Sequence, residues 1–546
     1  MTKLKFFLLS CLIALAFVAC RPGQSGNDET RPYPPELRLP YDGNQHHLIV
    51  AASTPAGVRV KGFQGAVRPN ANIRVRASGT EHSSSADVLG RFDLVLPFPN
   101  EFSHPEQIEL SISVRGTNFF PESTWTYRVR KLDLAFHAML GTQVKTKSTP
   151  NDILFLPNRS TPQVLVTASE SAVVEQLQLD APFEPPISAI YFSPKGKFTA
   201  EQASNPHSTV LLGSGNVAVT TLWGHHTLSH FALGEKKPRD TYRLEDAAGK
   251  PLQFELAAPI NPRKKVYFTG GASPDAMVSR MPGQHPQRML FKAPWLLVAY
   301  INYIDFAFTP DAPPQAGPGG IGIFHFDGQA LRSKGALSLP CQNAIDVIED
   351  DTGKPWALCS GLLGATHAKT YEALTDAELI ELAPVMLGSE NPFALGRRIK
   401  LGRFSPSSVL FVGDKIVVLS SLKPEIALMP YDAPMLLDSH VVRLATVVAN
   451  GGLGRAIEYG GGLVFMTAFG ANQVIVVDVG TGEINPWPFL HGIPMPVIDA
   501  ETTLGPGAIA KRPGQPGLDH DSNDIAVLLD KGPSVVPLSM LRLMGP

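Results

Sequence analysis

Short apolar runs separated by polar breaks recur over residues 150–546. The clearest example, "GGLVFMTAFGANQVIVVDVGTGEI" (461–484), has two apolar runs, a polar break between them and a turn sequence at its end. Related stretches lie at 162–180, 208–233, 294–327, 407–432 and 523–541. Each run has the length of a strand, so each stretch predicts a β-hairpin.

Hairpins that cannot bury their own faces must stack on one another, and closing the stack into a ring protects the strand edges. The pattern therefore predicts a β-propeller over 150–546. The stretch 461–484 resembles the Tyr-Val-Thr-Asn repeat family: Phe465-Met466-Thr467-Ala468 occupies the signature position, with Ala468 replacing the signature Asn. We expect about seven blades, with this hairpin forming the inner half of one blade.

Residues 60–97 show a period-two pattern instead. Ile73 and Val75 alternate with arginines, and Phe92, Leu94 and Leu96 alternate in the same way, which marks strands with one buried face. Further strands are expected at 108–114 and 124–129.

This segment resembles the bacterial Ig-like domains of surface proteins. The matching residues are Gly62, Gly65, Pro69, Ala71, Ala86-Asp87 and Gly90-x-Phe92, and Asn70 stands where the family usually has Gly. The resemblance implies an Ig-like β-sandwich over 46–131, a spacer or adhesive module without chemistry of its own. The expected fold class is thus all-β, a sandwich followed by a propeller.

One stretch departs from the β pattern. "YEALTDAELIELAPVML" (371–387) has Thr375 and Glu378 at capping-box spacing ahead of an apolar run. It predicts a short helix in a loop between strands, either packed over one face of the propeller or exposed to a partner.

The N-terminus reads as an export signal. Lys3 and Lys5 precede an apolar run too short to span a bilayer, and the run ends in Phe17-Val18-Ala19-Cys20, which resembles a bacterial lipobox. Residues 1–19 would be removed, Cys20 would carry lipid to the membrane, and 20–45 would form a flexible tether. The position after Cys20 holds Arg21 and not the Asp that is associated with retention in the inner membrane, so we expect the protein in the outer membrane. An ordinary signal peptide with an incidental Cys, or an uncleaved anchor, is the alternative.

The two remaining mature cysteines, Cys341 and Cys359, flank two apolar runs around an Asp-Asp-Thr-Gly turn. A hairpin would bring them together, and a disulfide closing a loop of about 17 residues would contribute roughly 3 kcal/mol in the chain-entropy model. Two buried thiols are the alternative.

The composition narrows the choice of function. With 48 Gly, 49 Pro and 18% charged residues the chain suits short strands and turns, and its net charge of −2 argues against nucleic-acid binding. Asp519, Asp521 and Asn523 alternate in a loop that could bind calcium, but the loop lacks the Gly and the distal Glu of calcium loops.

Other candidate groups point to structure. His225, His226 and His230 in "WGHHTLSHF" are expected in a strand and turn that keep three ligands from converging. The runs "GPGGIGIF" and "YGGGL" are interpreted as turns, and Glu349-Asp350-Asp351 as a solvated turn. No hydrolase, protease or redox motif is present, and no cofactor is expected.

Three hypotheses about function remain. The first is a non-enzymatic binding or scaffold module that uses a propeller face for a protein or an envelope polymer, with Trp295, Trp356 and Trp487 as possible stacking residues. The second is a propeller enzyme of the lactonase-like or quinone-dependent kind, which should gather acids or metal ligands at the centre of the ring. The sequence shows no such cluster, which favours binding. The third is adhesion at the cell surface.

Overall fold

The computed structural model describes the chain over 149–192, 204–260, 277–305, 309–385 (except 312 and 369), 391–444, 452–460 and 463–479, and in shorter segments, mostly strands, elsewhere between 49 and 542. The predicted signal peptide, Cys20 and the tether lie outside the described residues. Within the described part no helix is long and apolar enough to cross a membrane. The helices there are the short 3-10 turns η5 (Trp223–His225), η7 (Asp438–His440) and η8 (Phe469–Ala471).

Seven antiparallel sheets of four or five strands follow one another through the described residues after 135, and we number them as blades in chain order. Blade 1 contains β10 (Pro150–Phe155), β11 (Gln163–Ala168), β12 (Val173–Gln178) and β13 (Ser188–Tyr191). Blade 2 contains β14 (Pro206–Leu212), β15 (Val217–Leu222), β16 (Thr227–Ala232) and β17 (Asp240–Tyr242). Blade 3 contains β20 (Pro286–Lys292), β21 (Trp295–Tyr300), β24 (Gly320–Phe326) and β25 (Leu331–Ser338). Blades 4 and 5 contain β26 (Ala344–Glu349), β27 (Pro355–Cys359), β30 (Ala377–Pro384), β31 (Phe393–Gly402); and β32 (Pro406–Val412), β33 (Lys415–Ser420), β34 (Glu425–Pro430), β35 (Val441–Arg443). Blades 6 and 7 contain β36 (Ala456–Gly460), β37 (Leu463–Ala468), β38 (Gln473–Asp478), β39 (Leu490–Pro494); and β40 (Pro506–Lys511), β41 (Ile525–Leu529), β42 (Ser534–Arg542), β8 (Phe136–Leu140), β9 (Val144–Lys145).

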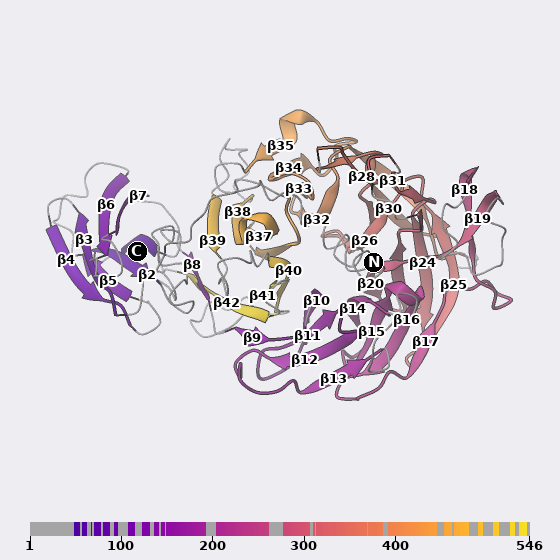
Figure 1. The fold of residues 1–546 in the computed structure, drawn as a ribbon, viewed down its shortest axis with the longest axis horizontal. Coiled ribbons are helices and arrows are strands. Elements are labelled where there is room, and N and C mark those ends of the chain that lie inside the picture. The colour runs from indigo at the N-terminus through magenta and orange to yellow at the C-terminus, as the bar shows by residue number, and fades with distance from the viewer. Residues whose placement is uncertain are drawn as a thin grey trace.

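The first strands of neighbouring blades contact each other all the way round, from β10 through β14, β20, β26, β32, β36 and β40 back to β10. The sheets therefore close into a seven-bladed β-propeller with these strands innermost, as expected from the hairpin pattern (Figure 1). Three two-stranded sheets lie outside the blades: β18 (Gln253–Ile260) with β19 (Val278–Pro282), β22 (Tyr303–Asp305) with β23 (Gln315–Ala316), and β28 (Leu363–Ala365) with β29 (Tyr371–Ala373).

The seventh blade is completed by a strand from before the first blade. β8 pairs antiparallel with β42, from Leu538 opposite Leu140 to Arg542 opposite Phe136, and β9 pairs with the start of β42. This strand precedes residue 150, where the sequence pattern places the start of the propeller. Backbone hydrogen bonds between the two ends of the propeller sequence thus hold the ring shut.

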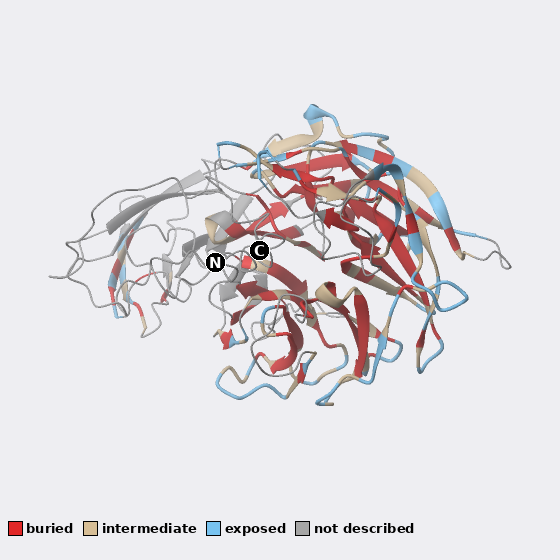
Figure 2. Ribbon diagram, turned by 45° about the vertical axis from the view of Figure 1, so that its right-hand side comes forward, coloured by how far each residue is buried: buried red, intermediate tan, exposed pale blue. Residues whose placement is uncertain are grey.

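Strands in the middle of a blade are apolar on both faces because each blade packs between two others. In β37, Val464 and Met466 join a core shared with blade 5, whereas Phe465 joins a core shared with blade 7. Figure 2 shows the result: buried residues fill the strands, and exposed ones concentrate in loops and outer strands. The hairpin at 461–484 is thus the middle pair of its blade, with β36 inside it, and not the inner half that we expected.

The N-terminal strands form two further antiparallel sheets. One contains β1 (Ile49–Thr54), β2 (Gly57–Gly62) and β5 (Phe92–Leu96), and the other β4 (Thr80–Ser85), β3 (Asn72–Ala77), β6 (Gln107–Val114) and β7 (Ser123–Arg130). Ile73 and Val75 are buried and Arg76 is exposed, which confirms the period-two prediction. Asn70 has φ 57°, a left-handed conformation that Asn tolerates better than most residues other than Gly.

Two further local predictions were wrong. The stretch 371–387 is no helix where the structure describes it: it contributes β29 and β30, and β30 pairs with β27 on one side and β31 on the other. Its side chains are buried between blades, and that tertiary pairing overrides the capping-box signal. The run at 317–324 was interpreted as a turn, but Gly320–Phe326 is strand β24. Its glycines admit aromatic rings close to the backbone, since a Cβ at Gly322 would meet Tyr300 at 2.7 Å.

Candidate functional site at the centre of the ring

The inner strands of five blades begin in the same way. The residue before each strand has a positive φ: 51° at Thr149, 44° at Asn205, 59° at His285, 60° at Asn343 and 53° at Ser405. The pairing of the inner strand with the second strand of its blade is irregular over the first residues of the inner strand. Regular pairing begins after this irregularity. A left-handed residue followed by an irregularity turns the chain from one blade into the next and fixes where the third strand residue lies.

That third position is equivalent in these five blades, and aligning the short apolar run that follows it extends the set to all seven. The residues are Asp152, Ser208, Arg288, Asp346, Ser408, Arg455 and Ala508. Four of them are charged, and they come from blades 1, 3, 4 and 6. We call Asp152, Arg288, Asp346 and Arg455 the central cluster.

Ion pairs show that the central cluster is assembled across the ring. Arg288 Nη1 donates to Asp346 Oδ2 at 3.1 Å. Arg455 Nη1 lies 3.6 Å from Asp152 Oδ1, and its Nη2 lies 4.0 Å from Asp346 Oδ2. Blade 7 separates Arg455 from Asp152 along the ring, and blade 5 separates it from Asp346. The Arg455 side chain must therefore reach across the centre.

The two carboxylates are already engaged by other donors. Asp152 Oδ2 accepts hydrogen bonds from Ser208 Oγ at 2.7 Å and from the backbone N–H of Thr209 at 3.3 Å. The Asp346 side chain is only 5% exposed and holds the bond from Arg288. The Arg288 side chain is 16% exposed and the Arg455 side chain 25%, so the arginines are the more exposed members of the cluster.

Thr467 on β37 fixes the backbone that presents Arg455. Arg455 N–H donates to Thr467 Oγ1 at 2.9 Å, and Thr467 N–H donates to Arg455 O at 2.9 Å. Thr467 Oγ1 also donates to Gly507 O in blade 7 at 3.1 Å. Gly454 is needed beside it, because a Cβ there would overlap Thr467 Oγ1. Arg455 is thus held at its base by blades 6 and 7.

A histidine borders the central cluster. His207 on β14 is partly buried, and its Nδ1 lies 3.3 Å from Asn151 Nδ2. Burial lowers the pKa of His207 to about 4, and the positive charges of Arg288 and Arg455 add to this effect, whereas Asp152 opposes it. The imidazole is therefore neutral at pH 7. Burial and the charge of Arg455 also lower the pKa of Arg288, to about 10.

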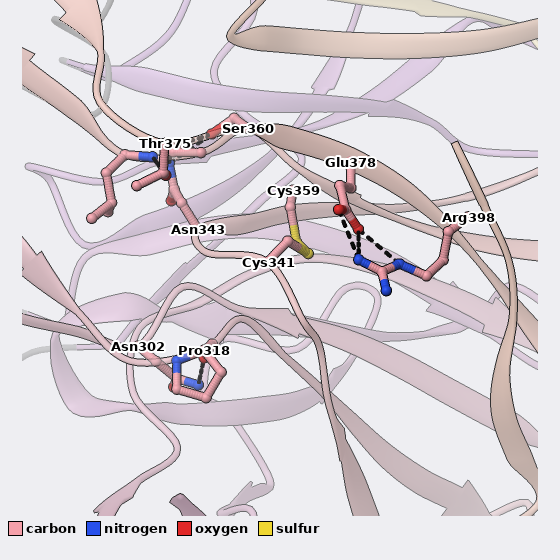
Figure 3. Close-up of a disulfide and its surroundings, with 11 residues drawn as sticks. Asn302, Pro318, Cys341, Asn343, Cys359, Ser360, Thr375, Glu378 and Arg398 are labelled. Carbon is pink, nitrogen blue, oxygen red and sulfur yellow. Dashed lines mark hydrogen bonds and ion pairs between the residues drawn. A yellow bond between two sulfur atoms is a disulfide. The ribbon is translucent and has the colours of Figure 1, made fainter. Parts of the chain in front are cut away.

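The predicted disulfide is present. Cys341 and Cys359 are bonded, with Cα atoms 6.1 Å apart, and the hairpin β26–β27 between them matches the predicted one. Figure 3 shows the bond beside the Glu378–Arg398 ion pair, in which Arg398 Nη2 lies 2.7 Å from Glu378 Oε2. The disulfide ties the entry of blade 4 to the end of its second strand and lies in a core shared with blade 3.

The acidic turn at 349–351 was expected to be solvated, and for Asp350 this prediction was wrong. This residue is 5% exposed. Its Oδ1 accepts from Thr352 and Lys354, and its Oδ2 accepts from Trp356 Nε1 at 3.0 Å and Tyr431 Oη at 2.7 Å. Tyr431 belongs to blade 5, so Asp350 is a buried anchor between blades, whereas Asp351 is exposed and accepts a hydrogen bond from Gly413 N–H of blade 5 at 2.9 Å.

The other predicted residues are dispersed. His225 ends η5, His226 follows it and His230 is buried in β16. His226 packs edge-on against His285, with ring centroids 4.6 Å apart. Across the described residues no three His, Cys, Asp or Glu side chains are placed to hold a metal ion. The calcium candidates Asp519, Asp521 and Asn523 lie outside the described residues.

The proposed stacking residues do not share a surface. Trp356 is fully buried between blades 4 and 5, where it packs against Phe411. Trp295 in blade 3 is partly buried against His325 and Phe393. Trp487 lies outside the described residues. The two that are described therefore serve blade packing.

Sequence reasoning missed the central cluster because its members are isolated charges within apolar runs. The signal that could have found them is the repeated start of the inner strands, visible in "TPNDILF", "NPHSTVL", "HPQRMLF" and "SPSSVLF". Aligning these stretches places Asp152 and Arg288 at one position, and the variants "NAIDVIE" and "GRAIEY" add Asp346 and Arg455.

No protein-family model and no curated protein matches the sequence. Among solved structures, the chain is similar to a catalytically inactive variant of virginiamycin B lyase from Staphylococcus aureus with quinupristin (10% identity, 74% of this chain and 99% of that chain, TM-score 0.42). It is similar to the WD40 β-propeller domain of Doa1 (9%, 74% and 97%, TM-score 0.43) and to a functionally unknown protein from Desulfotomaculum acetoxidans (11%, 70% and 99%, TM-score 0.39). Likeness at this level carries no argument about activity, and the fold assignment rests on the strand pairing.

Proposed function

We propose that the protein is a lipid-anchored binding protein of the bacterial cell envelope, whose propeller binds a protein or an envelope polymer. One observation carries the binding role: both carboxylates of the central cluster are engaged, Asp346 by Arg288 and Asp152 by Ser208 and Thr209. A carboxylate that already accepts such hydrogen bonds has fewer acceptor positions left for a substrate. The arrangement suits recognition better than hydrolysis.

The anchor is proposed from the residues around Cys20, with the N-terminal strands as an Ig-like spacer between the outer membrane and the propeller. Labelling cells with a radioactive fatty acid tests it. We expect label on the wild-type protein and none on Cys20→Ser, which should also leave the membrane fraction. Equal labelling, or a wild-type protein recovered in the soluble fraction, would refute the anchor.

The partner is sought by crosslinking in the native envelope, followed by mass spectrometry of the crosslinked peptides. Binding through the ring predicts crosslinks from residues near the central cluster to one reproducible partner. Protease treatment of intact cells then separates the two orientations, because loss of the propeller would place it at the cell surface. Crosslinks scattered over the outer strands would contradict a binding site at the ring centre.

A propeller enzyme is the second candidate, and His207 is the observation that favours it. The His207 imidazole is neutral at pH 7 and lies near Asp152, so it can accept a proton, as a weak base because burial lowers its pKa to about 4. Hydrolysis of a panel of lactones, followed by acid release, tests this possibility. Turnover that His207→Ala abolishes would establish the enzyme, and turnover unchanged in that variant would exclude His207 as its base.

A further inference from the structure

The arginines are the more exposed members of the central cluster. Their side chains are 16% exposed at Arg288 and 25% at Arg455, whereas those of Asp346 and Asp152 are 5% and 11% exposed. The formal charges of the four residues cancel, and burial together with the positive charge of Arg455 lowers the pKa of Arg288. The more exposed side chains of the cluster thus carry positive charge.

The guanidinium of Arg455 has N–H donors that are available to a ligand. Its guanidinium makes no hydrogen bond to any described residue, and the two nearest carboxylate oxygens, at 3.6 and 4.0 Å, lie beyond hydrogen-bond distance. Its Nη1 is a buried nitrogen without a hydrogen-bond partner among those residues. Buried donors are usually paired, because an unmet one costs about 1–3 kcal/mol.

The position of Arg455 is held independently of any ligand. Thr467 bonds both its N–H and its carbonyl oxygen and ties it to Gly507 in blade 7. A side chain whose base is fixed loses less conformational entropy when its tip binds. A guanidinium offers two parallel N–H groups, which match the two oxygens of a carboxylate or a phosphate.

We propose that Arg455, with Arg288 beside it, binds an oxyanion group of the ligand, either a carboxylate or a phosphate. Arg455 supplies the bidentate contact, and Arg288 supplies a second positive charge while it stays bonded to Asp346. Ser208 and Thr209 keep Asp152 occupied, so that carboxylate competes weakly for Arg455. This inference rests on the proposed binding role and names the chemistry of the ligand.

The test measures the melting temperature of the full chain in detergent at pH 7. Sodium phosphate, sodium acetate and trigalacturonate are titrated against sodium chloride at equal ionic strength. We expect a saturable rise in melting temperature with phosphate, or with acetate and trigalacturonate, above that with chloride. The first result identifies a phosphate site and the second a carboxylate site. No saturable rise with any of the three would overturn the proposal.

Variants of Arg455 distinguish a role in ligand binding from a purely structural role. Arg455→Gln should weaken the anion affinity, measured by calorimetry, at least about tenfold, and Arg455→Lys severalfold because the bidentate geometry is lost. Arg443→Gln is the matched control, since Arg443 lies in β35, is 81% exposed and has a carboxylate oxygen of Glu425 at 3.5 Å. Its affinity should equal that of the wild type.

A purely structural Arg455 would give a different outcome. Arg455→Gln would then melt at a lower temperature without anions but keep the same anion-dependent rise. Arg455→Lys keeps the charge, so it provides the comparison if the Gln variant fails to fold. Anion affinity equal to the wild type in either variant overturns the proposal. An envelope partner crosslinked to the ring centre would leave the binding role standing even then.

Discussion

Asp350 ties two blades together through a single carboxylate. Burial opposes its ionisation, but hydrogen bonds from Trp356, Lys354, Thr352 and Tyr431 outweigh that effect and hold the pKa of Asp350 well below its usual range. Arg397 lies over the rings of Trp356 and Tyr431, at 5.9 and 5.3 Å from their centroids, and completes this contact between blades 4 and 5.

Replacing Asp350 should therefore cost far more than replacing its neighbour. Asp350→Asn should lower the free energy of unfolding by about 2–4 kcal/mol, because the amide nitrogen cannot accept from Trp356 or Tyr431. Asp351→Asn removes the charge from an exposed residue and keeps a side-chain oxygen that can accept from Gly413 N–H, so it should change the free energy of unfolding by less than about 0.5 kcal/mol. Urea denaturation of both variants measures the difference, and equal effects would contradict the role of Asp350.

Histidines should make stability depend on pH. Burial lowers the pKa of His207 and His226 from 6.5 to about 4, and it lowers the pKa of His285 well below its usual value. Below pH 6.5 the unfolded chain binds protons that the folded chain does not, so the free energy of unfolding falls as the pH drops from 6.5 to 4. We expect a loss of stability over this window, with about 1–3 kcal/mol each from His207 and His226. Urea denaturation at pH 7 and pH 4.5 checks it.

The contribution of His207 can be isolated. His207→Gln should flatten the pH dependence by its share and leave the remainder, because Gln does not titrate. A variant whose curve between pH 4 and 7 matches the wild type would show that His207 titrates normally in the folded protein.

Among the elements, the strands were more predictable than the sites. Apolar runs gave the hairpins of blades 1, 2, 3, 5, 6 and 7 because a blade strand is buried on both faces and needs apolar residues throughout. The capping-box spacing of Thr375 and Glu378 misled because those side chains have other partners: Thr375 Oγ1 accepts from Leu362 N–H, and Glu378 binds Arg398. Local propensity loses to such contacts.

The Cys341–Cys359 disulfide constrains a single element, the hairpin β26–β27. Replacing Cys341 and Cys359 by Ala should lower the free energy of unfolding by about 3 kcal/mol, since the open loop regains chain entropy when unfolded. Urea denaturation of the double variant, and of the wild type with and without reductant, measures the loss. Alkylation and mass analysis of the native protein should find no free thiol at these positions, and two free thiols would refute the bond.

The closing strand can be tested by matched deletions. Removing residues 1–145 deletes β8 and β9, so it exposes the edge of β42 and should lower the melting temperature by several degrees or cause aggregation. Removing 1–131 deletes the N-terminal sheets but keeps β8, and it should leave the propeller transition unchanged. Calorimetry of both proteins makes the comparison. Equal losses would show that the N-terminal sheets, and not β8, support the ring.

At the scale of the whole molecule, periodicity and repetition predicted a ring, but not how it is closed or what lies at its centre. The pairing of β8 with β42 leaves no local signal, because neither strand reveals its partner. The central cluster is equally non-local: Arg455 meets Asp152 and Asp346 only after several blades have stacked. Such contacts follow from the closed geometry, so they emerge from coordinates and not from a pattern along the chain.

The β8–β42 pairing also has a consequence for how the protein is made. A ribosome synthesises β8 before any of the inner strands and β42 after all of them, and their paired residues, such as Phe136 and Arg542, are about 400 positions apart. The early strand must wait for its partner while the intervening sheets emerge with open edges. A translation product that stops within the last sheet would be an open, aggregation-prone set of sheets and not a smaller propeller. The nascent chain therefore needs protection from aggregation until its final strand is made.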